Sequence, residues 1–240
     1  MSTRYIPALS FKWLTPIYHP LLKWVMREEA FKHQLIRQAN IQPNMHLRDL
    51  GCGTGTLTVM LKRAHPGAEV TGLDGDQQVL EIARNKSRGM DIQWDEGLAS
   101  SLPYPDSAFD RVITSLVIHH LTTDDKRLAF KEIYRVLKPQ GELHVLDFGA
   151  PHSALTRFMT TYTRHLEEVA DNFDGLIPRF IMDAGFKSVS ETAHSVFVRN
   201  LRSKPFLAGL RVTSFVIAIL SSTTPDNRHG ALCQVLPSDG

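Results

Sequence analysis

The chain has 240 residues, of which 42% are hydrophobic and 22% are charged, and its formal net charge is +2 at pH 7. The composition is typical of a soluble globular protein. The length suits one well-buried α/β domain and is too short for two full-sized domains. Because the charge is close to neutral and the basic residues form no long run, nucleic acid is excluded as an expected partner.

The N-terminal part is expected to be helical after an aromatic, proline-punctuated segment over residues 1–20. Apolar residues over 21–38 recur at helical spacing. Basic residues in the same stretch, including Lys32, are mixed with Glu28 and Glu29. This pattern is typical of a solvated helix face.

Strands and helices then alternate along the chain. The patterns predict, in order, a strand near 46–50, a helix over 56–64, a strand over 68–73, a helix over 76–86, strands over 91–95 and 110–115, a helix over 124–137 and a strand over 141–148. Such alternation predicts an α/β, doubly wound fold, in which a mostly parallel sheet carries helices on both faces.

The C-terminal part has weaker patterns. They predict helices over 155–170 and 176–184, a strand over 186–192 and a last strand over 211–220, where β-branched residues are frequent. Residues 221–240 are rich in Ser, Thr, Pro, Asp and Gly, which is typical of a flexible tail.

We expect a cytoplasmic protein without integral membrane association. No signal peptide is apparent at the N-terminus. The longest apolar run, residues 206–220, contains Gly209 and Arg211, and a bilayer span needs about 20 residues. The two cysteines, Cys52 and Cys233, indicate neither a disulfide framework nor a metal site, and Cys52 is interpreted as a small loop residue rather than a nucleophile.

The most informative segment is the glycine-rich loop 51–55, which follows the strand 46–50. Gly51, Gly53 and Gly55 stand two residues apart, where glycine permits a tight turn and a close approach to a ligand. The dinucleotide fingerprint G-x-G-x-x-G would place its third glycine at Thr56. The observed register therefore favours a different ligand, and a tight turn without any ligand is the alternative.

Further candidate ligand-binding residues follow other strands. Asp74 ends the strand 68–73, and a carboxylate there is a good acceptor for ribose hydroxyls because it offers only acceptors. In parallel sheets ligands bind at the carboxyl ends of the strands. Gly51, Asp74, Glu96 and Ser115 all fall at such ends in the predicted fold.

Four segments between residues 45 and 148 together resemble the class I S-adenosylmethionine-dependent methyltransferases. They are the loop 51–55 with Asp49 two residues ahead, the strand 68–74, the stretch 97–112, and the helix–turn–strand passage 134–143. Within that family the sequence is most similar to the ubiquinone/menaquinone C-methyltransferase-like group. The resemblance implies a Rossmann-like fold, S-adenosyl-L-methionine as cofactor, and a small acceptor that is apolar or quinone- or phenol-like.

The resemblance also assigns residues and segments. It implies a cofactor-binding set that comprises Asp49, Gly51, Gly53, Gly55, Asp74, Gly75, Glu96, Gly97, Leu98 and Ser115. In this set Asp49 would hold the methionine ammonium group, directly or through water. The resemblance also implies a division of the chain into an N-terminal helical lid over 1–40, a methyltransferase domain over 41–195, and a last strand with a flexible tail over 196–240.

Two departures from the family pattern matter. Leu98 stands where many relatives carry Asp or Asn bonded to the adenine amino group, so that contact must come from backbone near 98–99, from Glu96 or from another side chain. The stretch 115–120 contains no carboxylate, so a metal-assisted mechanism, which needs oxygen ligands, finds no support.

Catalytic candidates lie after the strand 110–115. His119 and His120 are expected on the ligand side, where a histidine could take a proton from a phenol or an activated ring carbon. The alternative is that one of them caps the next helix or packs against the sheet. Tyr18 and His119 are candidate acceptor-binding residues. For Tyr18, burial of the N-terminal aromatic residues against the core explains the composition equally well.

Two other functional classes remain open. One is a protein that binds adenosylmethionine without transferring a methyl group, and the other is a nicotinamide-dependent oxidoreductase, which the register at Thr56 disfavours. The acceptor depends on residues within 1–20 and 150–200, where motifs are absent.

Overall fold

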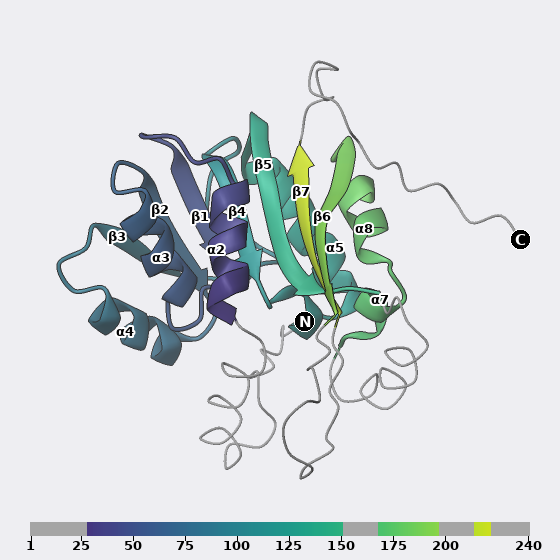
Figure 1. The fold of residues 1–240 in the computed structure, drawn as a ribbon, viewed down its shortest axis with the longest axis horizontal. Coiled ribbons are helices and arrows are strands. Elements are labelled where there is room, and N and C mark those ends of the chain that lie inside the picture. Colours follow the sequence, from purple (N-terminus) through teal and green to yellow (C-terminus); the bar gives the residue numbers. More distant parts are fainter. Residues whose placement is uncertain (1–27, 151–167, 197–213, 222–240) are drawn as a thin grey trace, which may run out of the picture.

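A computed structural model of the protein describes residues 28–150, 168–196 and 214–221 (Figure 1). Its elements are α2 (Glu28–Gln38), β1 (His46–Leu50), α3 (Thr56–Ala64), β2 (Glu69–Asp74), α4 (Gln77–Lys86), β3 (Ile92–Glu96), β4 (Phe109–Ser115), the 3₁₀ turn η1 (Ile118–His120), α5 (Thr123–Val136), β5 (Leu137–Phe148), α7 (Ala170–Phe173), α8 (Ile177–Asp183), β6 (Ser188–Val196) and β7 (Ser214–Ser221).

The strands form one seven-stranded sheet with the order β3-β2-β1-β4-β5-β7-β6. β1 to β5 pair in parallel, and β7 pairs antiparallel with both β5 and β6. The expected α/β architecture with a mostly parallel sheet is confirmed. A last strand is present where the sequence predicts one, and it is antiparallel to its neighbours. β7, the last of the described strands, lies inside the sheet and not at its edge (Figure 1).

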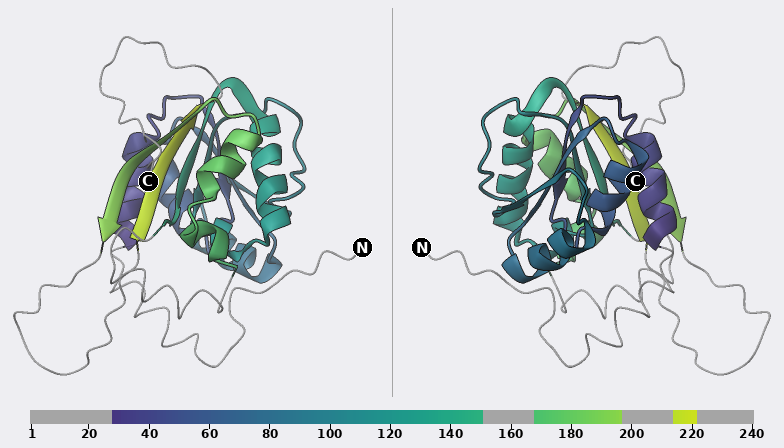
Figure 2. Two further views of the ribbon diagram at one scale, coloured as in Figure 1. Left: turned by 90° about the vertical axis from the view of Figure 1, so that its right-hand side faces the viewer. Right: turned by 90° about the vertical axis from the view of Figure 1, so that its left-hand side faces the viewer.

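Each face of the sheet carries its own hydrophobic core, because successive side chains of a strand point to opposite faces. On one face Leu47 and Ile113 pack with residues of α2 and α3. On the other face Leu50 and Val112 pack with residues of α5 and α8. Figure 2 shows the sheet edge-on between the two layers of helices.

The boundary between α5 and β5 differs from the expected one. The sequence pattern predicts a helix to residue 137 and a strand from 141, whereas α5 ends at Val136 and β5 starts at Leu137. The residue before a proline is disfavoured in the helical region, so Lys138 before Pro139 ends the helix early. Leu137 then pairs with Phe109 of β4, with a register shift after it.

Other expectations fall partly outside the described residues. Residues 21–27 of the predicted N-terminal helix, residues 155–167 of the next helix and residues 211–213 of the last strand belong to this group, and so does Tyr18. Ser221, expected to begin the tail, is the last residue of β7. Among the described helices none has the length and hydropathy of a membrane span.

Candidate active site

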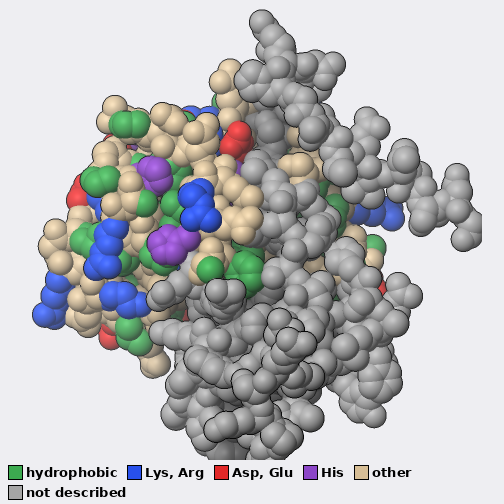
Figure 3. Space-filling view, viewed as in Figure 1, with side chains coloured by type: hydrophobic (Ala, Val, Ile, Leu, Met, Phe, Trp, Pro, Cys, Tyr) green, Lys and Arg blue, Asp and Glu red, His purple; other side chains and the backbone are tan. Residues whose placement is uncertain are grey.

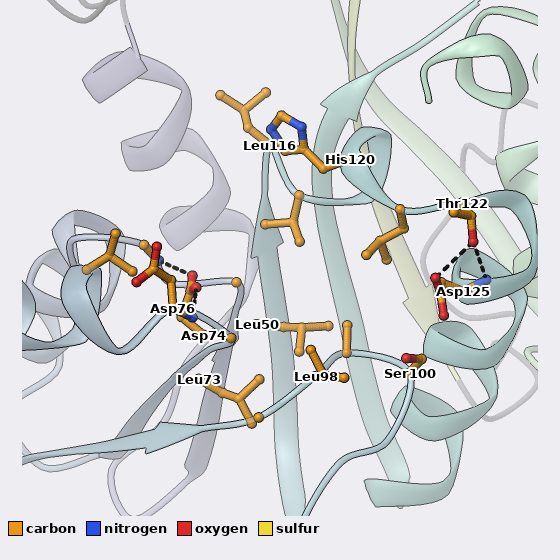
Figure 4. A pocket seen from close by; sticks show the side chains of 18 residues that line it. Leu50, Leu73, Asp74, Asp76, Leu98, Ser100, Leu116, His120, Thr122 and Asp125 are labelled. Carbon is orange, nitrogen blue, oxygen red and sulfur yellow. Dashed lines mark hydrogen bonds between the residues drawn. The ribbon is translucent and has the colours of Figure 1, made fainter. Parts of the chain in front are cut away.

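A cavity of about 360 Å³ opens at the carboxyl ends of the central strands (Figure 4). This size is within the usual range for small-molecule sites. The lining residues are Leu50, Gly51, Gly53, Leu73, Asp74, Gly75, Asp76, Val79, Gly97, Leu98, Ala99, Ser100, Leu116, Val117, His120, Leu121, Thr122 and Asp125. Seven of the residues predicted from the sequence are among them, namely Gly51, Gly53, Asp74, Gly75, Gly97, Leu98 and His120.

The glycine loop connects β1 to α3 in a left-handed conformation. Gly51, Gly53 and Gly55 have φ angles of +68°, +52° and +71°, a region that residues with a Cβ rarely adopt. The amides of Gly51 and Cys52 donate hydrogen bonds to the carbonyl of Leu73, at 2.8 and 2.9 Å. The loop is thereby fixed to the end of β2.

The three glycines have different surroundings. A Cβ on Gly53 would meet no atom within 4 Å, so this position opens toward the cavity. A Cβ on Gly55 would lie 2.4 Å from the Trp94 ring, and one on Gly51 would lie 2.4 Å from Val117. Gly53 therefore leaves room for a ligand, while Gly55, which does not line the cavity, makes room for Trp94.

Asp74, at the end of β2, faces the glycine loop across the cavity wall. Its Oδ2 accepts a hydrogen bond from the amide of Gly53 at 2.8 Å, and its Oδ1 accepts one from the amide of Asp76 at 3.0 Å. Burial raises the pKa of the Asp74 carboxyl above its usual value, against these backbone hydrogen bonds. The carboxylate is thus oriented by the backbone, with remaining acceptor capacity toward a ligand.

Asp49 lies behind the loop and not on the cavity wall. Its side chain is buried, and its Oδ2 accepts a 2.6 Å hydrogen bond from the hydroxyl of Thr58 in α3. Burial raises the pKa of this carboxyl to about 6, and the positive charge of Lys32 opposes the rise. The expected solvated helix face is wrong for Lys32, which is 7% exposed, because this charge faces the protein interior and Asp49.

The ends of β3 and β4 place the remaining predicted cofactor residues. Glu96 is exposed and does not line the cavity, whereas the amide of Gly97 donates to the carbonyl of Asp74 at 3.0 Å. The Ser115 hydroxyl is buried, with no hydrogen-bond partner among the described residues. The next residue, Leu116, has a φ of +60°, an uncommon conformation for a residue with a Cβ, and turns the chain into the cavity wall.

The two histidines of η1 differ in their positions. His120 lines the cavity, and burial together with the neighbouring His119 lowers its pKa to about 4. His119 is 4% exposed and does not line the cavity; its Nδ1 lies 2.8 Å from Asp147 Oδ1. The centroids of the two imidazole rings are 4.0 Å apart.

Asp147 in β5 is a central residue of the site that sequence reasoning missed. Its Oδ2 accepts hydrogen bonds from the amides of Val117 and Ile118, at 3.1 and 2.8 Å. Its Oδ1 accepts from Phe148 N at 2.7 Å, in addition to the contact with His119. These interactions outweigh burial and keep the pKa of Asp147 below its usual value. An acid near the end of a predicted strand was the available signal.

A second missed group lies across the cavity from Asp74, at the start of α5. Thr122 is the N-cap residue: its Oγ1 accepts a hydrogen bond from the amide of Asp125 at 3.2 Å and lies 2.8 Å from Asp125 Oδ2. The pattern T-x-x-D before a helix is a capping signal readable from the sequence. Its place in the cavity depends on the tertiary fold.

Cys52 has the environment of an inert loop residue. It is buried, and burial together with the negative charges of Asp49 and Asp74 raises the pKa of its thiol. The thiolate is the nucleophilic form of cysteine. This environment therefore supports the interpretation of Cys52 as a small loop residue.

In the described part of the chain, no group of three or more His, Cys, Asp or Glu residues could hold a metal ion. On the face drawn in Figure 3, the described Lys and Arg side chains are interspersed with hydrophobic and His side chains. This distribution gives the phosphates of a nucleic acid no continuous basic stripe on the described part of that face.

Comparisons with known proteins agree with this geometry. Residues 48–141 match a family model described as a methyltransferase domain. The demethylmenaquinone methyltransferase of Thermus thermophilus is 40% identical over 131 residues, which are 54% of this chain and 58% of that protein. The chain thus spans little more than half of that relative's length. The demethylmenaquinone methyltransferase of Listeria welshimeri is 30% identical over 199 residues, which are 72% of this chain and 80% of the relative.

Solved structures show the same fold. A Thermotoga maritima protein described as an S-adenosylmethionine-dependent methyltransferase and possible histamine N-methyltransferase has a TM-score of 0.63. Its sequence is 22% identical, and the superposition covers 89% of this chain and 98% of that chain.

Proposed function

The chain belongs to the class I S-adenosylmethionine-dependent methyltransferases, and from this premise we propose that it transfers a methyl group from S-adenosylmethionine to a small acceptor. The acceptor is proposed to be apolar and quinone- or phenol-like. The observation that carries the proposal is the position of Gly53. Its absent side chain opens toward the cavity, and its amide orients the carboxylate of Asp74 at 2.8 Å.

The residues of the cavity fit the cofactor that the family uses. We propose that Asp74 accepts hydrogen bonds from the ribose hydroxyls, as a backbone-oriented carboxylate can do. Gly51, Gly53, Gly75 and Gly97 would allow the cofactor to approach the backbone closely. Bound S-adenosylmethionine supplies a methyl group on a positively charged sulfur, which is already a good electrophile.

The other predicted cofactor residues are proposed to support the loops and not to contact the ligand. Asp49 bonds Thr58 and thereby fixes the first turn of α3 behind the glycine loop. Gly55 admits the Trp94 ring. Glu96 and Ser115 stand at the ends of β3 and β4, next to lining residues.

The chain's main catalytic task is to position the acceptor. Methyl transfer needs the acceptor atom in line with the S–CH₃ bond, roughly 3 Å away, in a site shielded from water. The lining between the two polar sides of the cavity is apolar, with Leu50, Leu73 and Leu98 labelled there in Figure 4. Such a lining would exclude water from the bound cofactor.

His120 is proposed to accept the proton that a phenolic or activated carbon acceptor loses. With a pKa of about 4 its imidazole is neutral near pH 7, so a lone pair is available, although it is a weak base. His119 is proposed to position His120, and Asp147 holds His119 in place. Similarity to the two demethylmenaquinone methyltransferases supports a quinone-like acceptor. We further propose that residues 1–40 form a lid, that Tyr18 contacts the acceptor, and that the protein is cytoplasmic. The methyltransferase domain is proposed to span residues 41–195, followed by the last strand and a tail over 196–240.

Isothermal titration of the full-length protein with S-adenosylmethionine tests the cofactor assignment. Gly53→Val should abolish or strongly weaken binding, because the side chain would enter the cavity. Gly89→Val is the matched control, since Gly89 also has a positive φ, of +81°, and open space around its missing Cβ, but does not line the cavity. Unchanged affinity in a folded Gly53→Val variant would refute the assignment.

A methyl-transfer screen with quinols and phenols tests the activity. Formation of S-adenosylhomocysteine with one of these acceptors is the expected result. Binding of adenosylmethionine with no turnover for any acceptor would instead support a binding protein that performs no methyl transfer. Binding of NADH in place of adenosylmethionine would support the oxidoreductase alternative.

A further inference from the structure

We propose that the carboxylate of Asp125 recognises the amino group of the adenine ring when the nucleoside part of the cofactor is bound. The inference rests on the proposed function, because it assumes an adenosyl ligand in the cavity. It assigns to a helix residue the hydrogen bond for which the loop after β3 offers only the apolar side chain of Leu98.

The cavity has two acidic sides separated by an apolar middle. Figure 4 shows Asp74 and Asp76 on one side, Leu50, Leu73 and Leu98 between, and Ser100, Thr122 and Asp125 on the other side. An adenosyl group has a matching order of chemistry: ribose hydroxyls, then a flat ring with large apolar faces, then an amino group. With Asp74 on the ribose hydroxyls, the far side of the ring points toward Asp125.

A carboxylate is the suitable partner at that position. The amino group offers only N–H donors at this edge, and an ionised carboxylate has about four lone-pair sites and no donor. Among the described residues, the carboxylate of Asp125 contacts the hydroxyl of Thr122, at 2.8 Å from Oδ2. This contact orients the carboxylate and uses only part of its capacity.

Capping of α5 does not by itself account for the carboxylate. In a capping box the acidic side chain bonds the backbone amide of the N-cap residue. Here the helix amide is satisfied by Thr122, whose Oγ1 accepts from the amide of Asp125 at 3.2 Å. The carboxylate of Asp125 contacts the hydroxyl of the N-cap residue, and it lines the cavity.

Leu98 explains why a residue outside the loop is needed. This side chain is 37% exposed and lines the cavity, so it can cover one face of the ring but cannot bond the amino group. Leu98 and Ser101 form a backbone bridge that holds the loop in its turn. The loop therefore supplies apolar contact, and α5 supplies the acceptor.

The test compares two ligands by isothermal titration with the full chain: S-adenosylhomocysteine and its analogue with unsubstituted purine in place of adenine. The parent should bind the adenine form about 10- to 100-fold more tightly, as expected for one hydrogen bond to a charged group. Asp125→Ala should lose most of this preference by weakening only the adenine form. Asp125→Asn, which keeps one carbonyl oxygen, should retain part of it.

Asp124→Ala is the matched control, because Asp124 has the same charge in the same helical turn and its side chain is 91% exposed. It should keep the parental preference. A parental preference in a folded Asp125→Ala variant would overturn the proposal, and so would equal binding of both ligands by the parent. If the parent binds neither nucleoside, the proposed function fails first, so the two failures are distinguishable. If Asp125→Ala does not fold, the ratio in Asp125→Asn decides.

Discussion

His119 Nδ1 lies 2.8 Å from Asp147 Oδ1, and both side chains are buried in the junction between η1 and the end of β5. The same carboxylate accepts hydrogen bonds from the amides of Val117 and Ile118. One acid thus holds the turn that carries His120 into the cavity wall. Its effect on the turn can be measured separately from the chemistry of the site.

Asp147→Asn should lower the free energy of unfolding at pH 7 by about 1–3 kcal/mol, because buried amides and His119 lose a charged acceptor. The pKa of Asp147 is lowered in the folded state, so its contribution to stability is present above the unfolded pKa of about 3.9 and is lost as pH falls through the folded pKa. Urea unfolding of both proteins at pH 7 and below pH 4 measures this. A difference between parent and variant that does not shrink at the lower pH would contradict the assignment.

Asp49 should have the opposite effect on the pH dependence. Its pKa is raised to about 6 in the folded state, so the folded protein binds more protons than the unfolded chain between about pH 4 and 6. Stability should fall as pH rises through this window, by at most about 1.4 kcal/mol per pH unit. Asp49→Asn should remove this slope because an amide does not titrate, while its oxygen can still accept the hydrogen bond from Thr58. Equal slopes in urea unfolding of parent and variant would show that Asp49 is not the group.

Asp74→Ala should weaken the binding of both S-adenosylmethionine and S-adenosylhomocysteine about 10- to 100-fold, because both carry the ribose hydroxyls. Asp76→Ala is the comparison, since the Asp76 side chain accepts from the amide of Gln78 as the N-cap of α4. Asp76→Ala should lower the free energy of unfolding by about 1 kcal/mol. It should weaken cofactor binding less than Asp74→Ala does. If titration shows parental affinity for Asp74→Ala, the ribose is held by Asp76 or by the backbone.

His120→Gln should reduce kcat for a phenolic acceptor more than it changes the affinity for the cofactor. Since the pKa of His120 is about 4, the parental rate should be insensitive to this group between pH 6 and 8 and fall as the imidazole gains a proton below about pH 5. Steady-state rates over this range measure both effects. A variant with an unchanged kcat and only a higher KM would make His120 a binding residue and not a proton acceptor.

Removal of residues 1–20 should reduce methyl transfer to an apolar acceptor far more than it reduces cofactor binding. This segment lies outside the described residues, and the expectation rests on its aromatic composition. Turnover and titration on the same truncated protein give both quantities. Intact turnover would place the whole acceptor pocket in the rest of the chain.

The parts of the site that depend on local geometry can be predicted from the sequence. The spacing of Gly51, Gly53 and Gly55 predicts a tight turn after a strand, and in the structure each of the three has a positive φ. Asp74 follows an apolar strand, and the parallel register of β1 and β2 brings it next to the loop. Such relationships follow from the carboxyl ends of the strands, which the hydrophobic pattern locates well here.

Contacts between distant segments are not visible in the sequence. Asp147 and Val117 are 30 residues apart and meet only because β5 lies beside β4. Asp125 and Asp74 line the same cavity because the N-terminal end of α5 lies at the carboxyl ends of the strands. Lys32 has neighbours of both charges in the sequence, which suggested a solvated position, whereas its burial depends on the packing of α2.

The position of β7 has a consequence for biosynthesis. This strand is the last of the described strands, yet it pairs with β5 on one side and with β6 on the other. During synthesis on the ribosome, the facing edges of β5 and β6 have unpaired backbone groups until residues 214–221 leave the exit tunnel. Unpaired strand edges are templates for aggregation. Ribosome-bound chains that stop before residue 214 should therefore recruit chaperones or aggregate, whereas chains in which residues 214–221 have emerged can close the sheet.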